Sequence, residues 1–157
     1  KNFKILDFGC GVGQDLIDAK LRGLDIEGLD FDSKTLKYCE YLINKRSLNI
    51  KLHKICDKLP IKNNYDVITC FEVIMQVPEP LLTLEHICEH INNNGLLILT
   101  YRFVQSHYSL AHKENIVYED KIEIFLNNNN FILLDNIHMW RNKDKSGKYL
   151  KIFKKIN

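Results

Sequence analysis

The fold is decided by Phe3-Lys4-Ile5-Leu6-Asp7-Phe8-Gly9-Cys10-Gly11-Val12-Gly13. An apolar strand pattern over residues 3–8 runs directly into a glycine-rich turn, and an amphipathic helix is expected over residues 14–21. Glycines in such a turn let a ligand approach the backbone closely, and the N–H groups at the helix start then face that ligand. The stretch therefore predicts a strand–turn–helix unit that binds a nucleotide-like molecule.

The spacing of the glycines distinguishes between nucleotide ligands. A dinucleotide fingerprint reads Gly-x-Gly-x-x-Gly, with a small third residue where the helix packs near the pyrophosphate. Here Gly13 comes one position early, and Gln14 stands where the small residue belongs. The carboxylate of Asp7, at the end of the strand, would repel a pyrophosphate but suits an ammonium group. A cationic ligand is therefore favoured, and an NAD-dependent oxidoreductase is the less favoured alternative.

Outside this unit, short apolar runs alternate with helical patterns, which is typical of βαβ units and a parallel sheet. Further strands are expected over residues 25–29, 50–55, 65–71, 96–101, 131–139 and 148–153. Helices are expected over residues 33–45, 78–90 and 117–128, and a turn over residues 92–95. The last two strands are predicted to pair as an antiparallel hairpin. The pattern predicts a three-layer, Rossmann-like α/β domain whose seven-stranded sheet is mostly parallel with one antiparallel strand.

A second polar position follows the second expected strand. Asp30 stands 17 residues after Gly13, where a carboxylate can accept both hydroxyls of a ribose. Phe31 follows it and offers an apolar face to a base. The alternative is that Asp30 caps the next helix, although Asp32 and Ser33 are better placed for that role.

Five blocks in register resemble the class I, seven-stranded, Rossmann-like S-adenosylmethionine-dependent methyltransferases. They are residues 5–13, 28–32, 56–60, 65–74 and 94–98, and with their flanks they cover roughly residues 3 to 101. The resemblance implies that the cofactor is S-adenosylmethionine and that the partner is a small-molecule acceptor. O-methylation of a metabolite or a sugar-like compound is the finer expectation.

The resemblance also implies roles for individual residues. Asp7 and the turn Gly9-Cys10-Gly11-Val12-Gly13 would hold the methionine moiety. Asp30 would take the ribose hydroxyls, and Phe31 would pack on the adenine.

Two further pairs complete the implied cofactor site. Cys56 and Asp57 would lie at the adenine edge, and Phe71 and Glu72 would border the methionine side. The chain departs from the family at Ile55, where an acidic residue is usual three positions before the Lys-Leu-Pro step. Asp57 must substitute for that residue, or the contact is lost.

The catalytic machinery expected from the resemblance is small, because the sulfonium of the cofactor already activates the methyl group and the protein mainly orients the reactants. The family often has Glu-x-x-x-His after the fourth strand, but Gln76 replaces the histidine here, and an amide cannot act as a base. His107 is the candidate catalytic base, with His112, Tyr101 and Tyr108 near it in sequence. The loss of the usual histidine leaves a non-catalytic, cofactor-binding or partner-regulating domain as an alternative.

Composition limits the other possibilities. The chain has 157 residues, 45% hydrophobic and 27% charged, which suits one globular domain over residues 1–157. A net charge of +2 is too balanced to argue for a nucleic-acid or membrane partner. The longest apolar runs, such as residues 95–100, are far shorter than the roughly 20 residues that span a bilayer.

The cysteine pattern argues against metal and disulfide chemistry. The five cysteines include no Cys-x-x-Cys pair, and their number is odd. Neither a disulfide framework nor a zinc site is expected, and a reducing compartment, the cytoplasm, is predicted. The chain does not begin with Met, and we expect the family's segment before the first strand to be absent. Nothing in the sequence indicates an oligomeric state.

Overall fold

The computed structural model describes residues 3–56, 61–101, 113–141 and 147–157. The strands are β1 (Lys4–Phe8), β2 (Asp25–Phe31), β3 (Lys51–Ile55), β4 (Tyr65–Phe71), β5 (Ile91–Thr100), β6 (Phe131–Arg141) and β7 (Gly147–Lys155). The helices are α1 (Gln14–Leu21), α2 (Lys34–Lys45), α3 (Pro80–Glu89) and α4 (Lys121–Asn128), with 3-10 turns η1 (Ile74–Gln76) and η2 (Lys113–Tyr118). This alternation of strands and helices agrees with the one predicted from the sequence.

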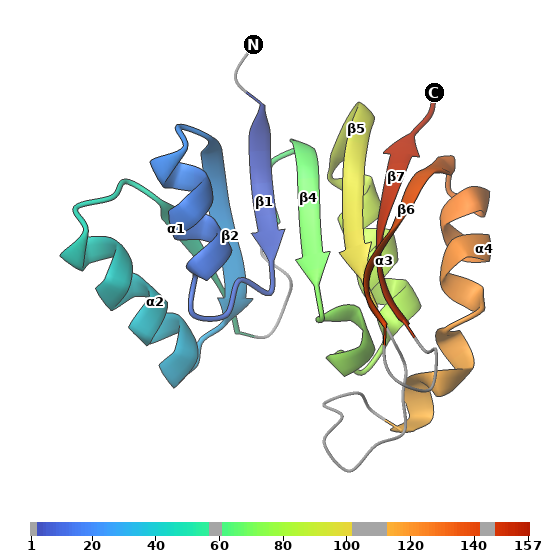
Figure 1. The fold of residues 1–157 in the computed structure, drawn as a ribbon, viewed down its shortest axis with the longest axis horizontal. Helices are drawn as coiled ribbons and strands as arrows, with labels where there is room; N and C mark the ends of the chain where they lie inside the picture. Colours follow the sequence, from blue (N-terminus) through green and yellow to red (C-terminus); the bar gives the residue numbers. More distant parts are fainter. Residues whose placement is uncertain (1–2, 57–60, 102–112, 142–146) are drawn as a thin grey trace.

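All seven strands form one sheet in the order β3-β2-β1-β4-β5-β7-β6 (Figure 1). Strands β1 to β5 pair in parallel, and β7 runs antiparallel to both β5 and β6. The predicted fold class, with its single antiparallel strand and terminal hairpin, is confirmed. Because β1 has β2 on one side and β4 on the other, the strand order reverses there. Ligands of open α/β sheets bind outside the carboxyl ends of strands at such a reversal.

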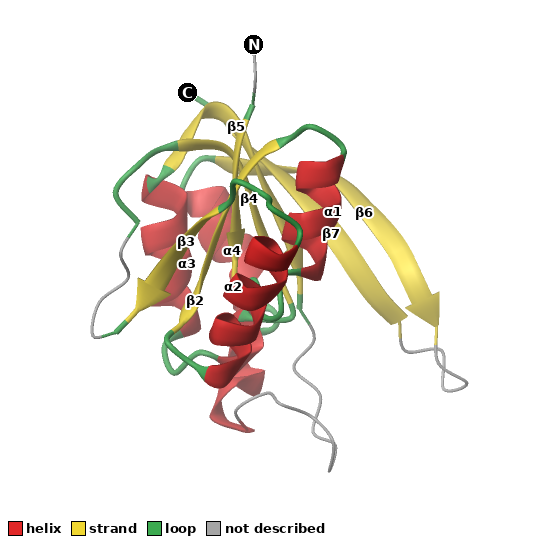
Figure 2. Ribbon diagram, turned by 90° about the vertical axis from the view of Figure 1, so that its left-hand side faces the viewer, coloured by secondary structure: helices red, strands yellow, loops and turns green. Residues whose placement is uncertain are grey.

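Helices cover both faces of the sheet, with α1 and α3 on opposite sides (Figure 2). The core on the α1 and α2 face includes Leu16, Ile17, Leu36, Cys39 and Ile43. The core on the α3 and α4 face includes Leu84, Ile87, Ile122 and Leu126. Alternation along β1 serves both cores: Leu6 and Phe8 belong to the second, whereas Ile5 packs against the first. The three predicted layers follow from this period-two pattern.

The largest differences from the predicted bounds concern β5 and α4. Strand β5 begins at Ile91, and residues 92–95 bulge opposite Asp66 before regular pairing resumes at Leu96. The amide of Asn92 donates to the Asp66 carboxylate at 3.0 Å, so the polar run is an anchored bulge inside the strand and not a turn before it. The helix expected over residues 117–128 is also divided, into η2 and α4.

Within the described ranges, no helix is both long enough and apolar enough to cross a membrane.

Candidate functional site

Backbone hydrogen bonds join the glycine turn after β1 to β2, near the end of that strand. The backbone N–H groups of Gly9 and Cys10 both donate to the carbonyl oxygen of Leu29, at 2.7 and 3.1 Å. Gly9, Gly11 and Gly13 have φ angles of 79°, 55° and 78°, a left-handed conformation that side chains with a Cβ rarely adopt. The turn therefore needs glycine at all three positions for its backbone path.

The three glycines differ in what surrounds them. A Cβ on Gly9 would lie 2.2 Å from a methyl of Val73, and one on Gly13 would lie 2.3 Å from Sγ of Cys39. A Cβ on Gly11 would meet nothing within 4 Å. Gly9 and Gly13 thus permit close packing inside the protein, whereas the backbone at Gly11 is open to an approaching ligand.

Asp30 reaches the glycine turn from the end of β2. One carboxylate oxygen accepts from the N–H of Gly11 at 2.6 Å, and the other accepts from the N–H of Phe31 at 2.7 Å. The cap of α2 is instead Ser33, whose hydroxyl accepts from the N–H of Leu36 at 3.2 Å. Asp30 is therefore not a helix cap, and the Phe31 ring beside it is 53% exposed.

Asp7, near the carboxyl end of β1 and just before the glycine turn, is only 4% exposed. The hydroxyl of Thr69, its register partner on β4, donates to the Asp7 carboxylate at 2.8 Å. Burial, together with the negative charges of Asp15 and Asp30, raises the pKa of Asp7 to about 6, although the hydrogen bond from Thr69 acts to lower it. The ionised form of the buried Asp7 carboxylate is therefore disfavoured. A cationic ligand beside it would stabilise that ionised form.

Phe71 and Glu72 lie at the carboxyl end of β4, and neighbouring side chains hold their backbone. Glu72 has a φ of 59°, and its N–H donates to the hydroxyl of Thr100 at 2.9 Å. The side-chain amide of Gln76 donates to the Glu72 carbonyl oxygen. Gln76, which stands where the family often has histidine, therefore fixes the turn that presents Glu72.

The segment after this turn is also held. The buried amide of Asn115 donates to the carbonyl oxygens of Met75 and Val77, at 3.2 and 2.7 Å. Sequence reasoning missed Thr69, Thr100 and Asn115. The two threonines stand opposite Asp7 and Phe71 in the strand register, so they become visible as soon as the strand order is known.

The structure describes only part of the site predicted from the sequence. Cys56 directly follows β3 and is exposed. Asp57 and the loop residues His107, Tyr108 and His112 lie outside the described residues. Their roles stay predictions.

Tyr101, the remaining residue named near the candidate base, has a structural environment. Its ring is 8% exposed, and its hydroxyl accepts a hydrogen bond from the ammonium of Lys151 at 3.0 Å. Burial raises the pKa of Tyr101, although Lys151 acts in the opposite direction. A buried phenol with a raised pKa is poorly suited to accept a proton as a phenolate, so Tyr101 is not a good candidate base.

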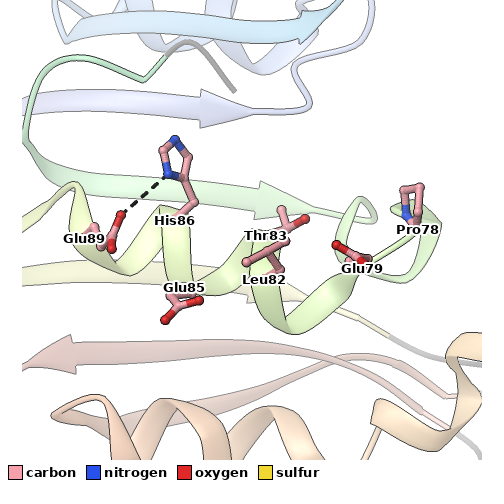
Figure 3. Close-up of a pocket in the computed structure, with 7 residues that line it drawn as sticks. All are labelled: Pro78, Glu79, Leu82, Thr83, Glu85, His86 and Glu89. Carbon is pink, nitrogen blue, oxygen red and sulfur yellow. Dashed lines mark ion pairs between the residues drawn. The ribbon is translucent and has the colours of Figure 1, made fainter. Parts of the chain in front are cut away.

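An open groove of about 620 Å³ runs along α3. It is lined by Pro78, Glu79, Leu82, Thr83, Glu85, His86 and Glu89 (Figure 3). None of these residues belongs to the cofactor site predicted from the sequence.

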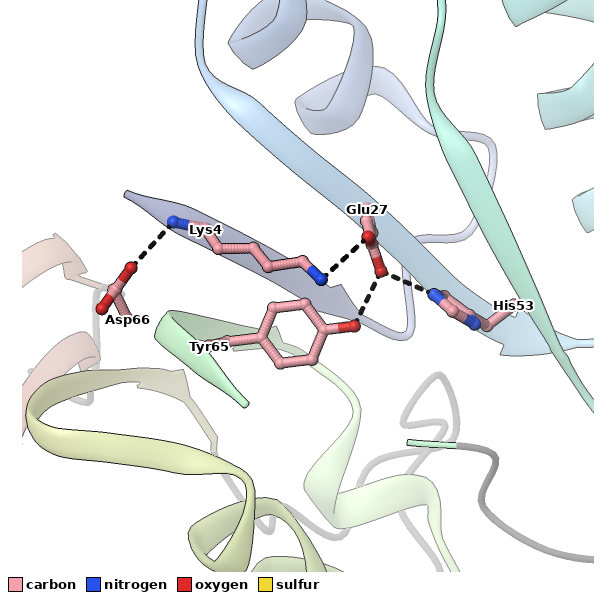
Figure 4. A network of polar contacts seen from close by, with 5 residues as sticks. All are labelled: Lys4, Glu27, His53, Tyr65 and Asp66. Carbon is pink, nitrogen blue, oxygen red and sulfur yellow. Dashed lines mark hydrogen bonds and ion pairs between the residues drawn. The ribbon is translucent and has the colours of Figure 1, made fainter. Parts of the chain in front are cut away.

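A second carboxylate, the partly buried Glu27 on β2, lies in a polar network (Figure 4). Its oxygens contact the ammonium of Lys4 at 3.2 Å, the imidazole of His53 at 2.7 Å and the hydroxyl of Tyr65 at 2.8 Å. The N–H of Lys4 also donates to Asp66 at 3.0 Å. Burial acts to raise the pKa of Glu27, but the hydrogen bonds from His53, Tyr65 and Lys4 outweigh it and hold the pKa at about 2. His53 therefore has a structural partner.

Comparison with known protein families gives a match over nearly the whole chain. The model of a family described as a methyltransferase domain matches residues 1–155. The match agrees with the resemblance inferred from the five sequence blocks.

Curated relatives match part of the chain at low identity. The ubiquinone biosynthesis O-methyltransferases of Rickettsia prowazekii and Rickettsia typhi are 29% and 31% identical to the chain over 98 and 100 residues. Each match covers 62% of this chain, and 39% or 40% of the relative. The chain thus matches well under half the length of these relatives.

Solved structures share the fold. An S-adenosylmethionine-dependent methyltransferase from Clostridium acetobutylicum superposes with a TM-score of 0.76 at 15% identity, covering 100% of this chain and 85% of that one. Magnesium protoporphyrin IX methyltransferase from Synechocystis, solved with bound S-adenosylmethionine, superposes with a TM-score of 0.73 at 18% identity, covering 98% and 70%. Together with the family match, these likenesses confirm the predicted family resemblance, fold class and cofactor class.

Proposed function

Because this chain belongs to the methyltransferase domain family, we propose that it transfers the methyl group of S-adenosylmethionine to an oxygen atom of a small-molecule acceptor. The observation that carries the proposal is the grouping of Asp7, Asp30 and the open backbone of Gly11 at the carboxyl ends of β1 and β2, where an open α/β sheet is expected to form its ligand crevice. All five cysteines are free thiols, which supports a cytoplasmic setting for this activity. We take residues 1–157 as a single domain for it.

Asp30 is the proposed ribose ligand. Its carboxylate has about four lone-pair positions, and the N–H groups of Gly11 and Phe31 occupy two of them. The remaining positions can accept the two hydroxyls of a ribose. Since the two backbone bonds hold the carboxylate in place, little conformational freedom is lost on binding. The exposed face of Phe31 is the proposed platform for the adenine, with Cys56 and Asp57 at the adenine edge.

Asp7 is the proposed counter-charge. S-adenosylmethionine carries two cationic groups, an ammonium and a sulfonium, and either one near Asp7 would favour its ionised form. The same carboxylate, together with Asp15 and Asp30, makes the crevice unfavourable for the pyrophosphate of NAD. Phe71 and Glu72 are proposed to border the methionine side.

Methyl transfer from S-adenosylmethionine requires few catalytic groups from the protein. When bound, S-adenosylmethionine supplies a methyl group already activated by its positive sulfur. The chain's contribution is to orient the acceptor oxygen toward that methyl group, which removes several kcal/mol of entropic cost. The proton of the acceptor hydroxyl needs a base, and His107 is our proposed base. Gln76 is excluded from that role, because its amide is not basic and already donates to Glu72.

One observation favours a second candidate function. The histidine that the family often has after the fourth strand is Gln76 here, and it supports the backbone instead. A domain that binds S-adenosylmethionine without turnover, and regulates a partner protein, would need no base at all.

The test is methyl transfer from isotopically labelled S-adenosylmethionine to a panel of phenols, sugars and amines. We expect label on a phenol or sugar oxygen, and its loss in Asp30→Ala but not in the neighbouring Asp32→Ala. Label on amines alone would contradict O-methylation. Binding of S-adenosylhomocysteine with no transfer to any acceptor would favour the non-catalytic function.

A further inference from the structure

The end of α3 and the residue after it bring three side chains that can bind a metal together, and two of them, His86 and Glu89, line the groove in Figure 3. One donor atom from each of His86, Glu89 and His90 lies within 4.8 Å of the other two. The Nδ1 atom of His86 is 3.6 Å from a carboxylate oxygen of Glu89, and the two imidazole centroids are 4.7 Å apart. Side chains three and four positions apart share one helix face, and histidines four positions apart serve as zinc ligands in helical sites.

The ring of His90 is already oriented for coordination. Its Nδ1 atom lies 2.8 Å from the carbonyl oxygen of His86. Because a carbonyl oxygen can only accept, Nδ1 carries the hydrogen, and in the neutral ring Nε2 keeps its lone pair. A hydrogen bond from one imidazole nitrogen to a backbone carbonyl is the usual way in which proteins fix a metal-binding histidine.

The ring of His86 is not used for hydrogen bonding by the described part of the chain. Its Nε2 atom is buried there without a hydrogen-bond partner. Its Nδ1 atom faces Glu89 at 3.6 Å, which is beyond hydrogen-bonding range. When the hydrogen of the neutral ring is on Nε2, the Nδ1 lone pair points toward the side where Glu89 lies and can coordinate a cation there.

The electrostatics of the helix end also favour a cation. The carboxyl end of a helix carries a partial negative charge. The carboxylates of Glu85 and Glu89 line the groove beside it. The opposing charge is the ammonium of Lys155, which donates to the carbonyl oxygens of Cys88 and Ile91 at 2.8 Å each. The cluster therefore has a surplus of negative charge.

We propose that His86, Glu89 and His90 bind one divalent transition-metal ion, such as Zn²⁺ or Ni²⁺. Two imidazole nitrogens and one carboxylate oxygen suit these metals and not Mg²⁺ or Ca²⁺, which prefer oxygen ligands throughout. The site lies at the opposite end of β4 from the cofactor crevice, because the carbonyl oxygen of His90 accepts from the N–H of Tyr65, the first residue of that strand. The ion would stabilise the end of α3 without taking part in methyl transfer.

The test is calorimetric titration of the chain, made without a polyhistidine tag, with Ni²⁺ alone. We expect one ion per chain, and a loss of affinity of about tenfold or more in His86→Ala and in His90→Ala. Glu89→Gln changes an exposed side chain and guards against a variant that fails to fold. His138→Ala removes an exposed histidine on β6 and is the matched control, expected to bind as the unchanged chain does.

Thermal unfolding gives a second measurement. Ni²⁺ should raise the Tm of the unchanged chain and of His138→Ala, but not of His90→Ala, because an ion that binds only the folded state stabilises it. Absence of Ni²⁺ binding, or equal binding by all the variants, would overturn the proposal. Loss of binding in His138→Ala but not in His90→Ala would place the ion elsewhere and overturn it too.

Discussion

Two carboxylates on neighbouring strands, the buried Asp7 and the partly buried Glu27, have opposite electrostatic surroundings. Glu27 has three hydrogen-bonding partners, Lys4, His53 and Tyr65, and its pKa is held at about 2. Asp7 has one hydroxyl, Thr69, and is surrounded by further negative charge, so its pKa is raised to about 6.

Glu27 is thus a carboxylate that stabilises the fold, whereas Asp7 is one that we propose a cationic ligand stabilises. The partners of Glu27 all come from the chain itself, so its charge contributes to folding. The charge of Asp7 is a cost to the folded protein that a bound cation would offset. Strongly perturbed acids in a crevice are candidates for function on this physical ground.

The largest expected effect is on stability. Glu27→Gln should lower the free energy of unfolding at pH 7 by about 3 kcal/mol, because the ionised carboxylate is favoured by the fold and the amide is not. Asp7→Asn, the matched change at the other carboxylate, should leave the free energy of unfolding unchanged or raise it. Urea denaturation followed by circular dichroism measures both. Equal destabilisation by the two variants would remove the contrast.

The pH dependence of stability should show both carboxylates with opposite signs. The folded pKa of Asp7 is raised above 3.8, so the folded state gains stability as pH falls from about 6 toward 4. The folded pKa of Glu27 is lowered from 4.5 to about 2, so its contribution is lost as pH falls between these values. Urea denaturation midpoints measured across this pH range test both assignments. The gain of stability between about pH 6 and 4 should be absent in Asp7→Asn, and the loss of stability between 4.5 and about 2 should be absent in Glu27→Gln. Profiles that match the unchanged chain would refute the assignment.

A smaller effect is expected on cofactor binding when Asp30 is changed. Asp30→Ala should weaken binding of S-adenosylhomocysteine by about 1–3 kcal/mol, the usual scale for charge-assisted hydrogen bonds. The Tm of the unliganded chain should change little, since Ser33 and not Asp30 caps α2. Asp32→Ala is the matched control. If Asp30→Ala unfolds the unliganded chain, the carboxylate is structural, like Glu27.

The smallest expected effect concerns Gln76. Gln76→Ala removes the hydrogen bond to the Glu72 carbonyl oxygen and should weaken cofactor binding by about 1 kcal/mol, the typical net value of one hydrogen bond. Gln76→His should not be required for turnover, and calorimetry with a transfer assay tests both variants. An inactive chain that gains activity in Gln76→His would show that a base has been lost.

The local sequence pattern predicted most of the strands and helices. It failed where a contact with a neighbouring strand, distant in the sequence, decides the structure. The strand at Tyr65–Phe71 and the helix at Gln14–Leu21 have the predicted bounds, because apolar spacing is a local property. The bulge at 92–95 was predicted as a turn, because its anchor is Asp66 on the neighbouring strand.

The same distinction applies to the site. The positions of Asp7, Asp30 and the glycine turn, at or just after the carboxyl ends of strands, could be predicted, because strand pattern and turn residues are local properties of the chain. Thr69 and Glu27 could not be assigned, because their roles depend on the register between β1, β2 and β4. The extent of the domain, residues 1–157, and the roles of all the predicted site residues, Asp57 and His107 among them, stay predictions.

The central claim is that the crevice around Asp7 and Asp30 binds S-adenosylmethionine and not a dinucleotide. Parallel calorimetric titrations of the chain with S-adenosylhomocysteine and with NADH test it most directly. We predict saturable binding of S-adenosylhomocysteine, weakened in Asp30→Ala, and no measurable binding of NADH. Tight binding of NADH without binding of S-adenosylhomocysteine would contradict the claim.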